Sequence, residues 1–253
     1  MKIQYCSDLH LEFPENRNFL KANPLLPKGD ILLLAGDIVP FAIMEEQGDF
    51  FNLLSDNFET TYWIPGNHEY YHSDIADRSG TFNERIKDNL FLVNNISLIQ
   101  SDVKFIFSTL WTRISPRNQF EIRQRLSDFH TIKFNNKGIT TDQYNLLHDQ
   151  SSTFLKEEFT KEGSDKKIIV THHVPTFMNY PEQYRGDSLN EAFAVEMYND
   201  IETSGADFWI FGHHHSNPGD FSIGKTRLLA NQLGYVRYNE NIGFDTGRVI
   251  EIN

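Results

Sequence analysis

The chain has 253 residues, of which 39% are hydrophobic, 13% aromatic and 23% charged. This composition excludes a disordered or fibrous protein and predicts a globular chain that is long enough to bury a sizeable core. The formal net charge of −12 argues against broad electrostatic attraction to nucleic acid or to anionic membranes. An anionic ligand would therefore need a local source of positive charge, such as a bound metal ion.

The first residues lead directly into polar Ser7 and Asp8, without the apolar stretch of a secretory signal. No apolar run elsewhere approaches the ~20 residues that span a bilayer. The single cysteine, Cys6, excludes an internal disulfide and agrees with a reducing compartment. We therefore expect a cytoplasmic protein without a membrane partner.

Short apolar runs rich in β-branched and aromatic residues predict seven buried strands. In chain order they lie at residues 3–6, 31–35, 60–64, 103–108, 168–171, 208–211 and 249–252.

Three stretches between these strands predict helices. Residues 81–84 indicate a helix start, and the capping-box pair Thr140 and Gln143 opens a helix that runs to about residue 159. Apolar positions within residues 189–201 fall on one face, as in an amphipathic helix.

The order of these elements predicts a layered α/β protein, because strands alternate with helices early in the chain and a strand-rich part follows. No repeat, low-complexity tract or linker-like change of composition divides it, so we predict a single domain over residues 1–253. Residues 111–138 are the least regular and contain four arginines, which indicates an insertion or a lid.

Polar residues follow five of the predicted strands at their carboxyl ends. They are Asp8 and His10, Asp37, Asn67 to Glu69, His172 and His173, and His213 to His215. Ligands of an open α/β sheet bind beyond the carboxyl ends of its strands, so these side chains are expected to share one pocket. Each cluster alone is compatible with ordinary loop chemistry, but five in this order at strand ends favour a functional site.

The chemistry of these residues is that of metal ligands. Carboxylate oxygens and imidazole nitrogens suit Zn, Mn and Fe, and there are more of them than a single four-coordinate ion uses, which favours two ions. Alternate residues of a strand point in opposite directions, so Asp8 and His10 reach one site only if the chain turns at once. Gly36, Gly66 and Gly212 make such turns plausible.

As an ordered set, the motifs resemble those of the calcineurin-like metallophosphoesterase superfamily. The resemblance covers the chain from its start to the C-terminus and includes residues 231–235 before the last strand. The motifs are Asp8-x-His10, Gly36-Asp37, Gly66-Asn67-His68-Glu69, His172 and Gly212-His213-x-His215.

The resemblance implies a four-layer α-β-β-α sandwich with two divalent or mixed-valence ions, Mn, Fe or Zn, at the edge of the sheets. Two sets of ligands are implied, with Asp37 bridging the ions. Asp8, His10 and His215 would hold one ion, and Asn67, His172 and His213 would hold the other. His173 is the alternative to His172, whereas His214 is expected to point away.

The resemblance further implies a phosphoesterase in which a metal-bridging hydroxide is the nucleophile. His68, outside both ligand sets, would stabilise the phosphoryl oxygens or protonate the leaving alkoxide. Glu69 would either orient His68 and raise its basicity or support a neighbouring metal ligand.

We expect a small phosphorylated substrate, with a phosphodiester or a nucleotide-like compound as the leading hypothesis. A phosphomonoesterase, including a protein phosphatase, is the alternative, and a scaffold that binds metal without catalysis is the remote one. Nucleic acid is disfavoured because no long basic track exists. The 111–138 segment could bind a second phosphate and a base through its arginines at 113, 117, 123 and 125 and through Phe120 and Phe129. The walls of the pocket could include Tyr180, Tyr184 and Tyr235. Ordinary surface roles for the arginines and packing roles for the tyrosines are the alternative.

Overall fold

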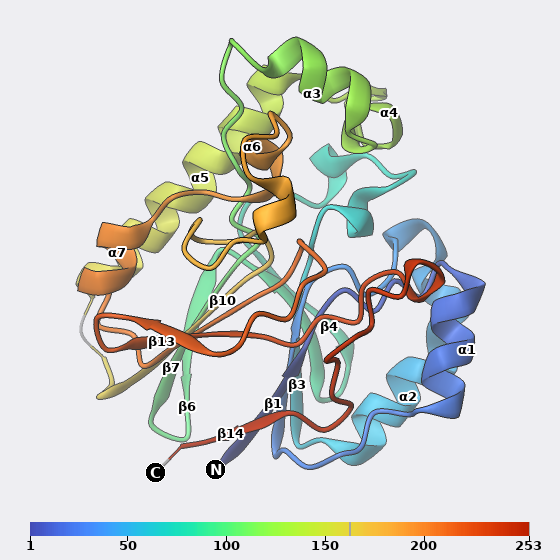
Figure 1. Cartoon of the computed structure of the whole chain (residues 1–253). Helices are drawn as coiled ribbons and strands as arrows, with labels where there is room; N and C mark the ends of the chain where they lie inside the picture. The colour runs from blue at the N-terminus through green and yellow to red at the C-terminus, as the bar shows by residue number, and fades with distance from the viewer. Residues whose placement is uncertain (162, 253) are drawn as a thin grey trace.

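The computed structural model describes residues 1–161 and 163–252. Two six-stranded sheets form its centre (Figure 1). The first has the order β14 (Val249–Glu251), β1 (Lys2–Cys6), β2 (Ile31–Ala35), β3 (Thr60–Ile64), β5 (Leu90–Asn94) and β4 (Phe82–Lys87). The second has the order β12 (Phe221–Ile223), β13 (Thr226–Ala230), β11 (Phe208–Phe211), β10 (Lys166–Thr171), β7 (Val103–Ser108) and β6 (Ile96–Gln100).

Each sheet has four parallel strands in the middle and one antiparallel strand at each edge. Parallel strands need both faces covered, and both sheets meet this condition. Tyr5 and Leu33 of the first sheet pack against Phe105 and Val170 of the second in a core between the sheets.

Helices cover the two outer faces. On the first sheet these are α1 (Pro14–Ala22) and α2 (Gly48–Asn57), and on the second they are α5 (Thr141–Thr160) and α7 (Tyr198–Thr203) (Figure 1). The predicted four-layer α-β-β-α sandwich is therefore confirmed.

All seven predicted strands are present, four of them with the predicted bounds. The edge and hairpin strands β4, β5, β6, β12 and β13 were not predicted, because their apolar residues alternate with polar ones or occupy short stretches. The predicted helix start at residues 81–84 is wrong. This segment is β4, which pairs antiparallel with β5 from Phe82 opposite Asn94, and the pairing outweighs the local capping signal.

Among the helices, α5 begins as predicted, with the capping box of Thr140 and Gln143 fully formed. The single helix over residues 189–201 is wrong, because α6 (Asn190–Phe193) and α7 are separate. Between them Ala194 forms a bridge with Val174 after β10, and the N–H of Val195 donates to the Val174 carbonyl at 2.9 Å. The apolar residues keep helical spacing in α6 and in α7, but the backbone between the two helices pairs with the chain after β10 and is not helical.

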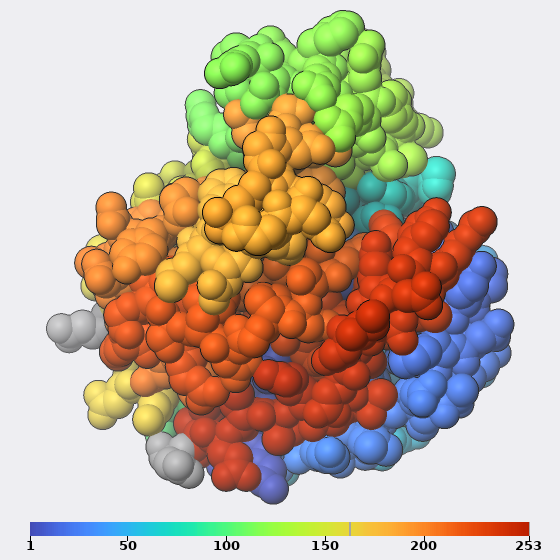
Figure 2. Space-filling model, viewed as in Figure 1, coloured from blue at the N-terminus to red at the C-terminus, as the bar shows by residue number. Residues whose placement is uncertain are grey.

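The segment 111–138 contains α3 (Gln119–Arg125), α4 (Asp128–Thr131) and the small hairpin β8 (Lys133–Phe134) and β9 (Lys137–Gly138). Its apolar residues form one cluster with the first part of α5 and with Tyr70, Ile75 and Ala192. Figure 2 shows this green segment directly against the yellow-orange chain around α6. A lid or insertion and a single domain remain predictions.

The remaining elements are 3₁₀ helices. They are η1 (Phe41–Gln47), η2 (His68–Tyr70), η3 (Ile75–Asp77), η4 (Glu182–Tyr184) and η5 (Val236–Tyr238). None of the helices in the described part of the chain combines the length and the apolar character needed to cross a membrane.

A buried ion pair joins the second sheet to α5, with Lys104 Nζ 3.0 Å from Glu158 Oε2 and both side chains 5% exposed. Burial alone would raise the pKa of Glu158, but hydrogen bonds from Lys161, Ser97 and Lys104 lower it to about 2. Because the folded pKa lies below the unfolded value, the carboxylate stabilises the fold above about pH 4. This stabilisation is lost as the pH falls from there toward 2.

We expect Glu158→Gln to lower the free energy of unfolding at pH 7 by about 2–3 kcal/mol. Urea unfolding at pH 7 and pH 3 measures this, and the difference from the wild type should shrink at the lower pH. The exposed neighbour Glu157→Gln is the control and should change little at either pH. A wild-type advantage that is equal at both pH values would contradict the assignment.

Candidate metal centre

The carboxyl ends of parallel strands from both sheets meet at one edge of the sandwich. Asp8 follows β1, Asp37 follows β2, and Asn67 follows β3 of the first sheet. His172 follows β10, and His213 follows β11 of the second sheet. All five side chains are buried, and the pocket beside them has a volume of about 400 Å³.

Left-handed backbone turns bring alternate residues to the same side. The backbone φ is 56° at Asp8, 47° at His10, 56° at Asp37, 78° at His213 and 48° at His215. Non-glycine residues rarely adopt this conformation, and it concentrates at functional sites, where the surrounding fold compensates for the strain. The turn that the sequence required is therefore made by the predicted ligand residues themselves.

The glycines contribute mainly by allowing close approach. Gly36 does have a positive φ of 90°, but Gly66 and Gly212 do not. A Cβ at Gly66 would lie 2.6 Å from His172 Nε2, and one at Gly212 would lie 2.6 Å from Asp8 Oδ2. Neither glycine can be replaced without moving a predicted ligand.

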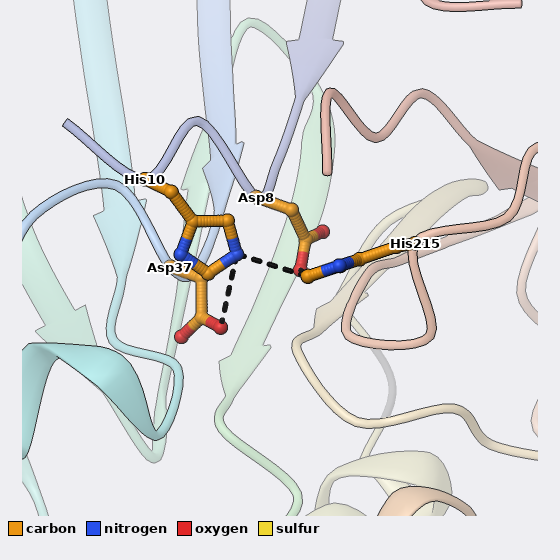
Figure 3. A group of neighbouring side chains, drawn as sticks. All are labelled: Asp8, His10, Asp37 and His215. Carbon is orange, nitrogen blue, oxygen red and sulfur yellow. Dashed lines mark hydrogen bonds and ion pairs between the residues drawn. The ribbon is translucent and has the colours of Figure 1, made fainter. Parts of the chain in front are cut away.

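The first group of donors consists of Asp8, His10, Asp37 and His215, whose donor atoms all lie within 4.8 Å of one another. Figure 3 shows the four side chains pointing toward a common centre. His10 Nε2 lies 2.9 Å from His215 Nε2, and His215 Nε2 lies 3.4 Å from Asp8 Oδ1. Two atoms that share an ion at about 2.1 Å are roughly 3.0–3.4 Å apart, so this spacing fits one metal ion.

The second group consists of Asp37, His172 and His213. His172 Nε2 lies 3.4 Å from Asp37 Oδ1, 3.1 Å from His213 Nδ1 and 3.2 Å from Asn67 Oδ1. Asp37 belongs to both groups, with Oδ1 toward His172 and Oδ2 3.7 Å from His10 Nε2. The seven predicted ligands thus lie in two adjoining groups.

Imidazole nitrogens and carboxylate oxygens of this kind suit divalent transition metals. His172 Nδ1 lies 2.9 Å from the Ala35 carbonyl, which holds the ring proton there and leaves Nε2 as a lone-pair donor that faces His213 Nδ1 at 3.1 Å. His10 and His215 also direct ring nitrogens at one another. A cation bound among these donors would satisfy them, so the residues fit a divalent metal site.

The two alternatives at positions 172 and 173 have different surroundings. His173 Nδ1 lies 3.2 Å from the Thr109 carbonyl, and its Nε2 lies 3.5 Å from the Tyr144 hydroxyl. Only His172 faces Asp37, so the geometry favours His172 as the ligand. His214 accepts a hydrogen bond of 2.8 Å from the Gln232 amide and is absent from both donor groups.

Two carboxylates that were not predicted from the sequence contact the Nδ1 atoms of histidines at the site. Glu12 Oε1 lies 3.1 Å from His10 Nδ1 and 2.8 Å from His68 Nδ1, while Glu240 Oε2 lies 2.6 Å from His215 Nδ1. Burial raises the pKa of Glu12, but His10 and His68 lower it to about 2. An ionised Glu12 favours N–H at each Nδ1, which leaves Nε2 of His10 free to bind a metal.

The predicted pairing of Glu69 with His68 is not observed. The buried carboxylate of Glu69 accepts backbone N–H bonds of 2.9 Å from Asp37, 2.7 Å from Ile38 and 2.6 Å from Gly66. These contacts correspond to the other hypothesis, in which Glu69 supports a neighbouring ligand. The place beside His68 is taken by Glu12, and its spacing two residues after His10 was the available signal.

His68 lies between the donor groups and the pocket. Its Nε2 is 3.1 Å from the Tyr235 hydroxyl, and its ring stacks on Tyr71 with centroids 4.0 Å apart. Burial opposes protonation of His68, but the charges of Asp37 and Glu12 outweigh it and raise its pKa. The imidazole is therefore suited to carry a proton beside the donor groups.

A model of the family described as calcineurin-like phosphoesterase matches residues 1–217 of the chain. The chain belongs to the calcineurin-like phosphoesterase family. The matched range includes all seven predicted ligands and His68, whereas Tyr235 and Glu240 lie beyond it. As a member of this family, the chain carries clusters of Asp and His residues where a divalent metal fits.

Two known proteins are similar to this calcineurin-like phosphoesterase over nearly their whole length. The uncharacterized protein L509 of Acanthamoeba polyphaga mimivirus is 31% identical over 265 residues, covering 94% of this chain and 93% of that protein. The crystal structure of phosphopantetheinyl hydrolase (PptH) from Mycobacterium tuberculosis has a TM-score of 0.70 and 14% identity, covering 98% and 95% of the two chains. The second likeness shows the common fold.

The segment 111–138 contributes Asp128 to this phosphoesterase site. Its buried Oδ1 accepts hydrogen bonds of 2.8 Å from Asn67 Nδ2 and 2.8 Å from the Tyr71 hydroxyl. By holding Nδ2, Asp128 leaves Asn67 Oδ1 directed toward His172.

We expect Asp128→Leu to weaken the binding of Mn²⁺ by about 10–100-fold, because the Asn67 amide loses the acceptor that orients it. Asp128→Asn keeps a carbonyl oxygen and should lose much less. Calorimetric titration of the metal-free protein measures both affinities, and thermal unfolding checks that both variants are folded. Equal affinities of folded Asp128→Leu and wild type would contradict this role.

Proposed function

We propose that this chain is a binuclear metal-dependent hydrolase that cleaves a phosphodiester or nucleotide-like substrate. The observation that carries the proposal is the position of Asp37, whose two carboxylate oxygens face two separate groups of histidines. A carboxylate in this position is suited to bridge two ions. Mn, Fe and Zn all match the donors.

Two bound divalent ions would lower the pKa of a shared water toward neutrality and stabilise charge on the phosphoryl oxygens. The other contributions come from the chain. His68 lines the pocket, and its Nε2 lies 3.1 Å from the hydroxyl of Tyr235, which lines it too. We therefore assign His68 the transfer of a proton to the oxygen of the leaving group. Glu12 holds the opposite ring nitrogen and stabilises the protonated form of His68.

The size and charge of the site support a small substrate. Its volume of about 400 Å³ lies in the range of small-molecule pockets. The net charge of −12 supports neither a nucleic-acid partner nor a membrane partner. A cytoplasmic location is part of the proposal.

Asp37→Ala should abolish hydrolysis of bis-p-nitrophenyl phosphate and reduce the number of metal ions bound, because both donor groups lose a member. Activity assays after reconstitution with Mn, Zn or Fe, together with metal analysis of the same samples, measure the two effects. A variant that retains activity would overturn the bridging role of Asp37.

His68→Ala should lower kcat for bis-p-nitrophenyl phosphate by about 10²–10⁴-fold while the metal content stays unchanged, because His68 belongs to neither proposed ligand set. Loss of metal from this variant would make His68 a ligand instead.

Parallel assays on p-nitrophenyl phosphate separate the proposed activity from its alternatives. A preference for this monoester would support a phosphomonoesterase. No hydrolysis of either compound with any of the metals would support the scaffold.

A further inference from the structure

The pocket beside the donor groups contains little free positive charge apart from what the metal site supplies. Among the residues that the structure describes, Arg125 is the one lysine or arginine that lines it. The other predicted arginines, at positions 113, 117 and 123, do not line it. Arg113 pairs with Asp149, and Arg117 lines a neighbouring surface pocket that shares Arg125 and Asp187 with this one. This pocket thus offers one arginine, rather than several, to a second phosphate, which favours ordinary surface roles for the others.

Arg125 itself is already paired with two carboxylates. Its Nη1 and Nη2 lie 3.0 and 2.9 Å from the two carboxylate oxygens of Asp187, and Nη1 lies 2.6 Å from Glu121. In this bidentate ion pair, Asp187 occupies the guanidinium N–H groups that would otherwise bind a phosphate. Asp187 and Glu240 also line the pocket, so a second phosphate would meet two carboxylates there.

Five aromatic rings contribute to the remaining wall. Tyr180, Tyr184, Phe193 and Tyr235 line it, together with Tyr71. Phe120 is 72% exposed and Phe129 is buried in the packing of the 111–138 segment, so neither contributes to the pocket. Tyr184 is 40% exposed, which leaves a ring available to cover a flat group on a substrate.

From this arrangement we propose that the pocket takes a phosphoester with a single anionic phosphate and an uncharged aromatic group. In this assignment, which rests on the proposed function, Tyr184 packs against the aromatic group. Asp187 excludes a second phosphate by occupying Arg125 and by its own negative charge. Asp187 and Tyr184 are thus specificity residues contributed by the chain around α6.

The test uses three phosphonates that differ only in the group attached to phosphorus: methylphosphonate, phenylphosphonate and benzene-1,4-diphosphonate. Their dissociation constants are measured by calorimetry on the manganese-loaded protein, which requires no turnover. Phenylphosphonate should bind about three- to tenfold more tightly than methylphosphonate. Benzene-1,4-diphosphonate should bind about three- to tenfold more weakly than phenylphosphonate.

Two variants with matched controls assign these differences to residues. Tyr184→Ala should reduce the preference for phenylphosphonate over methylphosphonate, whereas Tyr198→Ala, which removes a ring that is 42% exposed outside the pocket, should preserve it. Asp187→Asn should reduce the preference for phenylphosphonate over benzene-1,4-diphosphonate, because it removes a carboxylate from the pocket and releases Nη2 of Arg125. Glu121→Gln removes the other partner of Arg125 and should leave this preference unchanged.

Equal binding of methylphosphonate and phenylphosphonate, tighter binding of the diphosphonate to the wild type, or no binding of any compound would overturn the assignment. An unchanged ratio of the affinities for phenylphosphonate and benzene-1,4-diphosphonate in folded Asp187→Asn would remove the role of Asp187. Hydrolysis of bis-p-nitrophenyl phosphate is assayed on the same preparation. If hydrolysis is absent while the predicted order of affinities holds, the proposed function fails and the binding assignment stands.

Discussion

The contact between the two sheets at His172 is the constraint on which the site depends. His172 belongs to the second sheet, yet its Nδ1 lies 2.9 Å from the carbonyl of Ala35, the last residue of β2 in the first sheet. Its Nε2 then faces Asp37, two residues further along. The distance between the donor groups is therefore set by the packing of one sheet on the other. The apolar core between them supplies the rigidity that long polar side chains lack.

Backbone strain is concentrated where the chain leaves these strands. Left-handed conformations at five donor residues each cost about 1–3 kcal/mol in isolation, and only a well-packed surrounding fold maintains them. Glu69 is part of this support, because its carboxylate binds backbone N–H groups after both β2 and β3. A single buried side chain thus stabilises two neighbouring strand ends of the calcineurin-like phosphoesterase fold.

Carboxylates lie both among the donor histidines and next to their other ring nitrogens. Asp8 and Asp37 lie among the histidines, and Glu12 and Glu240 lie behind them. This arrangement suits cations held by direct donors and histidines kept in one tautomer by carboxylates. The pocket beside it is bounded by aromatic rings and by one arginine that is already paired. Positive charge for a phosphate would therefore come mainly from cations at the donor groups, which is consistent with the net charge of −12.

The sequence by itself determined the features that depend on local pattern. Apolar runs placed the central strands, the Thr140 capping box placed the start of α5, and polar residues at strand ends placed the donors at one edge of the sandwich. These signals are short-range, because side-chain periodicity and capping are properties of neighbouring residues.

Only the tertiary structure decided which residues meet across long distances in the chain. It distinguished His172 from His173, put Glu12 rather than Glu69 beside His68, and brought Asp128 to Asn67. It also interrupted the helix predicted at 189–201, because a strand end offered better backbone partners. Such choices depend on how the two sheets and the 111–138 segment pack together, and no local pattern contains that information.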